Sequence, residues 1–236
     1  MPARKPSAKK PPAPAAPSPA EQARALQVYR LLGEAHPSAH IMLGYDSPFQ
    51  LLVAVILSAQ TTDVGVNKVT PILFEKYPDA ESLAAADPAD VEEIVHPTGF
   101  FRNKTKNIMG AARMVVAEFD GRVPDTMEEM LKLPGVARKT ANIVLANSFG
   151  VVVGIPVDTH VLRLSQRLGF TKNDDPVKVE RDLMALFPQE TWYDLTYRII
   201  EHGRATCIAQ RPVCGECTVS ELCPSAFEVK GWREHR

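Results

Sequence analysis

Only one stretch of this chain resembles a β-strand, and that scarcity constrains the fold more than any other feature. The stretch is Val151–Val157, whose apolar run is interrupted by Gly154 and Pro156. Glycine and proline both weaken a strand, and one isolated strand cannot form a stable sheet. The sequence therefore predicts an all-α protein, with a seam between two units near residues 150–157, where the helical pattern breaks.

Helix-starting signals occur along most of the chain. Ser18-Pro19 and Ser47-Pro48 each place a capping serine before a first-turn proline. Thr126–Glu129 has the pattern of a capping box, and Asp63 can cap the helix that follows it. The segment Phe49–Leu57 is apolar on nearly every side, which predicts a buried central helix. About ten helices are expected in all.

Composition limits the function classes without choosing one. The chain has 236 residues, 45% of them hydrophobic, which suits one large domain or two small ones with real cores. No apolar run is long enough to span a membrane, so no membrane partner is expected. The net charge of −1 excludes nucleic-acid binding through bulk charge alone, although a local basic patch can still bind phosphates.

The two ends of the chain are expected to be tails. Residues 1–20 contain seven prolines, six alanines and four basic residues, and such a segment cannot bury enough apolar surface to become ordered. Residues 227–236 are the predicted C-terminal tail. The first tail lacks the apolar stretch of a secretory signal, so we expect a cytoplasmic protein, with organelle or nuclear targeting by the basic tail left open.

A candidate phosphate site lies in the segment Leu133–Ala141. A tight Pro-Gly turn there joins two predicted helices, and such a turn exposes successive backbone N–H groups beside a helix N-terminus. A simple connection between two packed helices would have the same composition, and that alternative stays open. The residues expected to approach phosphate are Gly135, Val136, Ala137 and Arg138.

Lys139 and Asp158 form the candidate catalytic pair. Lys139 falls in the first turn of the helix after the Pro-Gly turn, where a cation opposes the helix dipole. That position favours the neutral amine, which is the form that acts as a nucleophile. The alternative is a solvated surface lysine, which is the usual role of a lysine without an acidic partner nearby. Asp158 begins the next helix, where it can act as an N-cap or as an ionised partner for a developing cation. His160 is expected to be structural.

Two further residues are candidates for DNA contact. Phe100 lies in the basic and aromatic stretch Gly99–Lys106, and an exposed aromatic side chain can wedge into a base stack. Gln60 ends the buried helix, where its amide can fill a gap in a base pair or cap its own loop. For Phe100, the alternative is a buried residue at a helix start.

The four cysteines are Cys207, Cys214, Cys217 and Cys223, and they follow the spacing C-x6-C-x2-C-x5-C. Their clustering in a chain without a secretory signal argues for one ion or cluster rather than for disulfides. Structural zinc sites have two short Cys-x2–4-Cys pairs, whereas only one such pair occurs here. The wider loops suit an iron–sulfur cluster, so from spacing alone zinc and iron–sulfur both remain open.

Together these motifs resemble the endonuclease III family of bifunctional DNA glycosylases in the helix-hairpin-helix superfamily. The matching stretches are SPFQLLVAVILSAQTTD, LPGVARKTANIVL, VDTHVLRLSQRLG and HGRATCIAQRPVCGECTVSELC. The resemblance implies a six-helix barrel over residues 40–151 and a cluster domain made of 21–39 and 152–226, with a DNA cleft between them. It also implies a [4Fe–4S] cluster on the four cysteines and a monomer that acts on double-stranded DNA.

The resemblance also assigns roles to single residues. Lys139 matches the nucleophilic lysine of the family, and Asp158 matches its catalytic aspartate. Gln60 falls where the family inserts a glutamine opposite the flipped nucleotide, and Phe100 falls where relatives place an apolar wedge, often leucine. Ala137 departs from the family, which usually has a second glycine in the hairpin, and its methyl group is expected to affect hairpin affinity rather than chemistry.

The implied activity is excision of damaged bases, usually oxidised pyrimidines, followed by strand cleavage by β-elimination through a lysine Schiff base. Two alternatives are a monofunctional adenine-type DNA glycosylase and a non-enzymatic, metal-stabilised DNA-binding protein. The adenine-type enzymes share the cluster but lack the lysine, so Lys139 argues against them. Covalent trapping on DNA separates the enzyme from a protein that only binds.

Overall fold

The computed structural model describes residues 16–236, so most of the predicted N-terminal tail lies outside the described residues. Within that range the chain forms eleven α-helices and three short 3₁₀ helices, and no residue is in a strand. The all-α prediction is confirmed. The strand-like segment Val151–Val157 is an extended connection between helices rather than part of a sheet.

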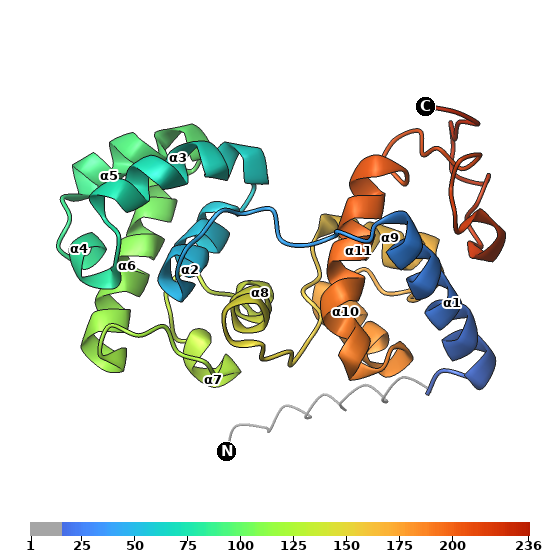
Figure 1. The fold of residues 1–236 in the computed structure, drawn as a ribbon, viewed down its shortest axis with the longest axis horizontal. Helices are drawn as coiled ribbons and strands as arrows, with labels where there is room; N and C mark the ends of the chain where they lie inside the picture. The colour runs from blue at the N-terminus through green and yellow to red at the C-terminus, as the bar shows by residue number, and fades with distance from the viewer. Residues whose placement is uncertain (1–15) are drawn as a thin grey trace, which may run out of the picture.

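The helices form two groups that stand side by side (Figure 1). One group contains α2 (Pro48–Leu57), α3 (Asp63–Lys76), α4 (Ala80–Ala84), α5 (Pro88–Val95), α6 (Phe101–Phe119), α7 (Met127–Met130) and α8 (Arg138–Phe149). The other contains α1 (Pro19–Ala35), α9 (Thr159–Arg167), α10 (Pro176–Leu186) and α11 (Trp192–Ala205). The 3₁₀ helices are η1 (His96–Thr98), η2 (Gln189–Thr191) and η3 (Ser220–Leu222).

Capping side chains begin these helices much as the sequence predicts. Ser47 accepts a hydrogen bond from the Gln50 amide, and Thr126 accepts one from the Glu129 amide. Ser18 and Glu21 form a complete capping box, which fixes the start of α1 at Pro19. The last two residues of the expected tail, Pro19 and Ala20, therefore belong to the helix, because the capping box satisfies amides that would otherwise need water.

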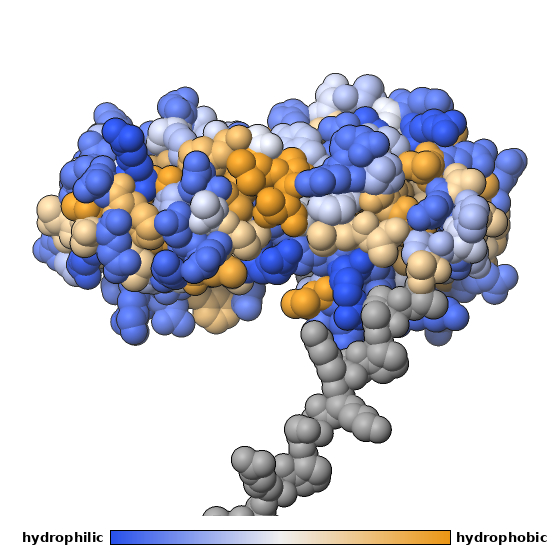
Figure 2. Space-filling model, turned by 90° about the horizontal axis from the view of Figure 1, so that it is seen from below, coloured by the Kyte–Doolittle hydropathy of each residue, from blue (hydrophilic) through white to orange (hydrophobic). Residues whose placement is uncertain are grey.

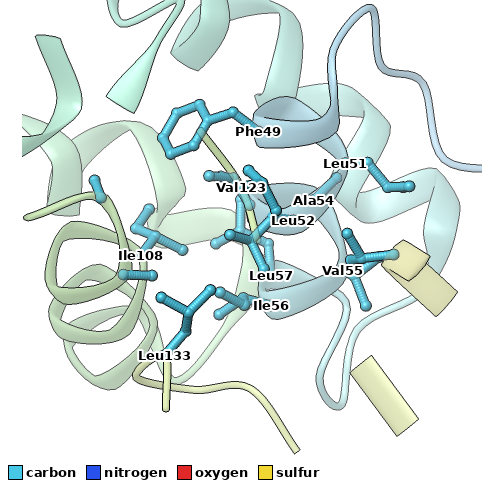
Figure 3. Packing of buried hydrophobic residues seen from close by; sticks show 14 of the residues in the cluster. Phe49, Leu51, Leu52, Ala54, Val55, Ile56, Leu57, Ile108, Val123 and Leu133 are labelled. Carbon is cyan, nitrogen blue, oxygen red and sulfur yellow. The ribbon is translucent and has the colours of Figure 1, made fainter. Parts of the chain in front are cut away.

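Each group of helices has its own apolar core. Every residue of Phe49–Leu57 is buried, so α2 is the central helix that the sequence predicts, and Figure 3 shows its side chains meeting Ile108, Val123 and Leu133. The cluster around α2 draws its residues from 41–151. The second cluster combines residues of α1 with residues between 152 and 223. These memberships support the proposed division into 40–151 and 21–39 with 152–226.

Helix α8 makes several polar contacts with the other domain. Asn142 donates through Nδ2 to Oε1 of Glu180 on α10 at 2.9 Å. Asn147 donates through Nδ2 to the Tyr197 hydroxyl at 2.7 Å and accepts from the Tyr193 hydroxyl at 2.9 Å, and both tyrosines lie on α11. In the space-filling view the molecule has two lobes that meet at a narrower waist (Figure 2).

The C-terminal segment 227–236 packs against the loop that carries the cysteines. The Arg233 amide donates to the Pro212 carbonyl at 2.8 Å, and the Gly215 amide donates to the Arg233 carbonyl at 3.3 Å. Phe227 and Trp232 stack edge to face with their ring centroids 4.9 Å apart. None of the helices in residues 16–236 has both the length and the apolar character that a membrane span requires.

Candidate DNA-repair site

The turn between α7 and α8 is shaped by Pro134 and Gly135. The Val136 amide donates to the Leu133 carbonyl at 3.1 Å, which closes the turn. Gly135 has φ +77°, and a Cβ at this position would lie 2.8 Å from Cβ of Asn107 on α6. Both the backbone angle and the close approach require glycine. The tight Pro-Gly turn predicted from the sequence is therefore present and packs on α6.

The start of α8 leaves backbone amides without partners. Its N-cap residue, Ala137, makes no side-chain capping bond. Within residues 16–236, the amides of residues 138–140 have no recorded acceptor. Uncapped amides at a helix N-terminus suit a phosphate oxygen. Gly135 and Ala137 are exposed beside these amides. Val136 is buried and its amide already donates within the turn, so Val136 is the least able of the three to bind a phosphate.

Arg138 is held by the second domain rather than directed only at solvent. Its Nε donates to Oε2 of Glu180 at 2.7 Å, and the Glu180 side chain is only 7% exposed. The other carboxylate oxygen accepts from Asn142. The sequence gives no sign of this pair, because 42 residues separate Arg138 from Glu180. Arg138 was predicted from its place in the hairpin to contact DNA, and the structure gives it a structural partner.

Lys139 and Asp158 line the same open cleft between the domains. The cleft has a volume of about 900 Å³, and its walls also include Gln60, Asp63 and Arg204. Lys139 comes from the barrel side, as the second residue of α8, and is exposed. Asp158 comes from the other side, at the start of α9. The fold therefore brings together the two residues that the sequence analysis paired.

The Asp158 carboxylate is fixed by the helix that it caps. Its Oδ1 accepts from the His160 amide at 2.9 Å and from the Val161 amide at 2.8 Å. Within the described part of the chain no hydrogen bond is recorded for Oδ2. Burial lowers the pKa of the neighbouring His160 below its usual value, although the Asp158 charge acts in the opposite direction. The N-cap interpretation of Asp158 is thus correct, and it leaves one oxygen for chemistry.

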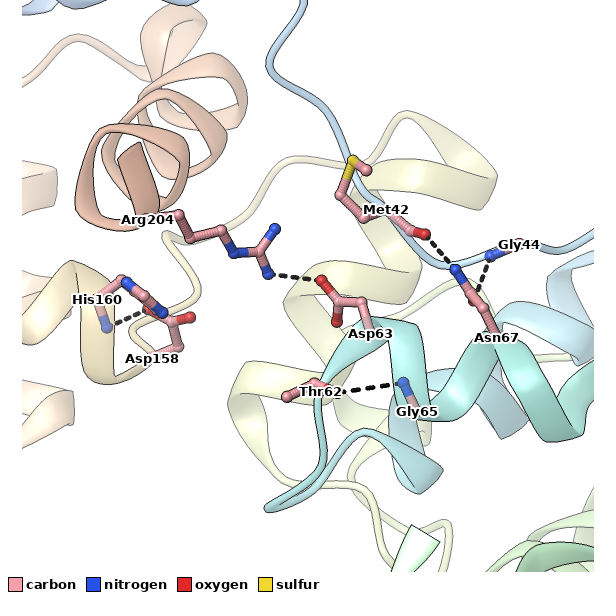
Figure 4. Close-up of polar contacts among 9 residues, drawn as sticks. All are labelled: Met42, Gly44, Thr62, Asp63, Gly65, Asn67, Asp158, His160 and Arg204. Atoms are coloured by element: carbon pink, nitrogen blue, oxygen red, sulfur yellow. Dashed lines mark hydrogen bonds and ion pairs between the residues drawn. The ribbon is translucent and has the colours of Figure 1, made fainter. Parts of the chain in front are cut away.

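An ion pair between Asp63 and Arg204 crosses the cleft, as Figure 4 shows. Arg204 on α11 donates to Oδ2 of Asp63 at 2.6 Å. The sequence suggests that Asp63 caps α3, but Thr62 takes that role by accepting from the Gly65 amide at 3.1 Å. Asp63 is the first helical residue instead, so its carboxylate is available to Arg204. An ion pair between distant segments has no local sequence signal.

Gln60 and Phe100 both lie exposed at the tips of loops on the barrel domain. Gln60 has φ 55° and Phe100 has φ 49°, which places both in the left-handed region that favours glycine. Phe100 is 68% exposed, so it is not the buried side chain that its alternative interpretation required. Gln60 is among the residues that line the cleft, and Phe100 lies outside that lining.

All four cysteines line one pocket in the second domain. The other lining residues are mostly apolar, and they come from α9, α11 and the segment after α11. Burial raises the pKa of Cys217 to about 11 and raises the pKa of Cys223 as well. In residues 16–236 no three His, Cys, Asp or Glu side chains converge on a point where they could hold a single metal ion. The four cysteines thus share one pocket.

The chain resembles known proteins of base excision DNA repair. Residues 53–189 match the family model described as HhH-GPD superfamily base excision DNA repair protein. The endonuclease III of Synechocystis sp. is 59% identical over 206 residues, which cover 87% of this chain and 94% of that protein. The chain belongs to the endonuclease III family, whose members are DNA glycosylases with AP lyase activity in base excision repair.

Solved structures of relatives show the same fold on DNA. A non-covalent complex of an endonuclease III with DNA has a TM-score of 0.84 at 41% identity, covering 88% of this chain and 97% of that chain. A trapped covalent intermediate of an endonuclease III with DNA gives the same values. Family membership thus makes this chain a DNA glycosylase and AP lyase, as the sequence predicted.

The ion pair between the buried Glu180 and the half-exposed Arg138 gives a test of domain coupling. Replacing Glu180→Gln should lower the free energy of unfolding by about 1–3 kcal/mol, because a charge-assisted bond is lost. Arg138 is 40% exposed and can turn to water, so no charge is left buried without a partner. Urea titration followed by circular dichroism measures the change.

The control is Asp194→Asn. Its carboxylate is 45% exposed, pairs with Arg198 within α11 and also accepts from the Tyr29 hydroxyl. Such surface pairs contribute little, so this variant should lose clearly less stability than Glu180→Gln. Equal losses in the two variants would contradict a special role for the pair between the domains.

Proposed function

We propose that Lys139 is the nucleophile of this glycosylase and lyase, and that Asp158 is its acidic partner. The observation that carries the proposal is that both side chains line one cleft, from opposite domains, beside the uncapped start of α8. An amine and a carboxylate on facing walls of a cleft can share the work on a sugar carbon placed between them.

The reaction begins with attack of the neutral Lys139 amine on C1′ of the damaged nucleotide. The bond between C1′ and the base breaks, and the base leaves with the electron pair and takes up a proton. The attached amine gives up one of its protons, and the sugar ring then opens between C1′ and O4′. O4′ takes up a proton, and C1′ and Nζ form a protonated Schiff base, an iminium. The iminium acidifies the C2′ proton. Loss of that proton breaks the C3′–O bond, and water finally hydrolyses the Schiff base.

Asp158 would act through its fixed position and its charge. Two backbone amides hold Oδ1 in place, so Oδ2 can face the positive charge that develops at the sugar. The same carboxylate can take a proton from the attacking amine. A carboxylate held in this way needs little rearrangement during the reaction, which is what electrostatic stabilisation of a transition state requires.

DNA contacts would come from the barrel side of the cleft. We assign the exposed amides beside Gly135 and Ala137 to a phosphate, Gln60 to the gap left by the flipped nucleotide and Phe100 to the base stack. Flipping a base costs a few kcal/mol, and less for a damaged pair, which favours damaged bases over normal ones. We propose oxidised pyrimidines as substrates and a cytoplasmic monomer acting on double-stranded DNA.

The four cysteines would hold a [4Fe–4S] cluster. In such a cluster each cysteine binds a different iron, so the sulfurs surround a volume, whereas zinc needs four ligands within about 2.3 Å of one point. One apolar pocket lined by all four cysteines supports the cluster. When bound, the cluster would fix the loop and thereby help place the second domain on DNA.

Borohydride trapping tests the role of Lys139. The wild-type protein should become covalently attached to a duplex with an abasic site, because borohydride reduces the Schiff base to a stable amine. Lys139→Gln should fold and bind the same duplex but form no adduct, as gel electrophoresis would reveal. Lys132→Gln, which changes an exposed lysine of the preceding turn, is the matched control and should trap normally. An undiminished adduct in Lys139→Gln would exclude Lys139 as the nucleophile.

Asp158→Asn separates catalysis from helix capping. Asparagine caps a helix about as well as aspartate, so the free energy of unfolding should fall by about 1 kcal/mol or less. The rate of base release in single-turnover kinetics should fall about 10²–10⁴-fold, because the charge is lost. Asp87→Asn changes the N-cap of α5, far from the cleft, and should leave the rate unchanged. If the loss of rate in Asp158→Asn were accounted for by the fraction of unfolded protein, the role of Asp158 would be purely structural.

Metal analysis distinguishes the cluster from zinc. The purified protein should contain about four iron atoms and about four acid-labile sulfides per chain. Cys214→Ser should lower both, because one iron loses its protein ligand, whereas Ser220→Ala in the same loop should not. About one zinc atom per chain, without iron or sulfide, would overturn the assignment.

A further inference from the structure

A buried lysine, Lys104, joins the two loops whose tips are Gln60 and Phe100. Its Nζ donates to Oγ1 of Thr61 at 2.6 Å and to the carbonyl of Thr98 at 2.7 Å. The Thr61 hydroxyl in turn donates to the same Thr98 carbonyl at 2.5 Å. The three groups therefore form a closed triangle of hydrogen bonds between the loop before α3 and the loop before α6.

Each exposed tip lies within two residues of this triangle. Gln60 directly precedes Thr61, and Phe100 follows Thr98 after a single glycine. Both tips have left-handed backbone conformations, which are unfavourable for these residue types and persist only where the surroundings impose them. The triangle lies where the two strained loops meet, so it fixes the position of one tip relative to the other.

Stability alone does not account for a lysine at this position. Lys104 is only 4% exposed, and within residues 16–236 no carboxylate pairs with it. Burial lowers the pKa of its ammonium group, which reflects the cost of removing a cation from water. An apolar side chain of similar length would fill the space without that cost. The role of Lys104 is therefore to hold its two acceptors in place rather than to add net stability.

We propose that Lys104 is a positioning residue that sets the separation of Gln60 and Phe100, so that both enter the duplex together when a base is flipped. Lys104 itself lies beneath the loops, away from the reacting sugar. This inference rests on the proposed function, because it takes Gln60 and Phe100 to be the residues that contact the opened base pair.

The variant Lys104→Met removes both hydrogen bonds and keeps the side chain long and buried. Base release from a duplex lesion should slow about 10–100-fold in single-turnover kinetics, because misplacement of about 1 Å has effects of this size. Cleavage of a single-stranded oligonucleotide with an abasic site should be unchanged, since no base pair has to be opened. Lys106→Met, which removes an exposed charge two residues further on, measures the effect of charge alone.

A double-mutant cycle tests whether Lys104 acts through the two tips. In a Gln60→Ala, Phe100→Ala background, Lys104→Met should cause no further loss of duplex activity. A full additional loss there, or equal losses on duplex and single-stranded substrates, would overturn the inference. If the Gln60→Ala, Phe100→Ala protein itself keeps full duplex activity, the proposed DNA contacts fail, and the inference fails with them.

Thr61→Val provides a second route to the same result if Lys104→Met does not fold. Valine has nearly the shape of threonine but no hydroxyl, so the triangle loses one corner while Lys104 keeps its bond to Thr98. Duplex activity should fall in the same direction and single-stranded cleavage should persist. Normal duplex activity in a folded Thr61→Val protein would show that the link between the loops has no part in opening the base pair.

Discussion

The buried carboxylate of Glu180 determines how the two domains meet. It accepts hydrogen bonds from Arg138 and Asn142, which lie one turn apart on α8, so it fixes both the position and the rotation of that helix. It also lies against Gly154 in the connection between the domains, where any Cβ would collide with it. Lys139 is the residue after Arg138, about 100° further round the helix. The contacts of Glu180 on one side of α8 therefore direct the Lys139 amine, which lies on another side of the helix, toward the cleft.

Most charged side chains around the cleft form ion pairs with one another. Arg204 pairs with Asp63, and Arg138 pairs with Glu180. Among residues 16–236, neither Lys139 nor Asp158 takes part in an ion pair. Lys139 and Asp158 are thus available to a substrate, while the ion pairs of their charged neighbours join the two domains. This separation follows from helix geometry, since residues at adjacent positions on α8 face different partners.

The sequence predicts the local features well and the distant contacts poorly. The buried α2, the serine caps and the turn at Gly135 depend on neighbouring residues, so their patterns are legible in the chain. The pairing of Lys139 with Asp158 came partly from helix-end chemistry and partly from resemblance to a family. The contacts of Glu180 and the triangle around Lys104 join segments far apart in sequence, and no periodicity or spacing specifies them. Thr62 rather than Asp63 caps α3, because either residue type satisfies the local rule.

The domain that contains the cysteines is assembled from both sides of a continuous barrel domain. Its core joins residues of α1 to residues of α9, α10 and α11. On a ribosome that adds about 5–20 residues per second, α1 emerges and then waits on the order of 10–40 s for its partners. During that interval the barrel has all its own residues and can fold first. The apolar face of α1, formed by Ala25, Val28 and Leu32, stays exposed for the same interval and is open to chaperones.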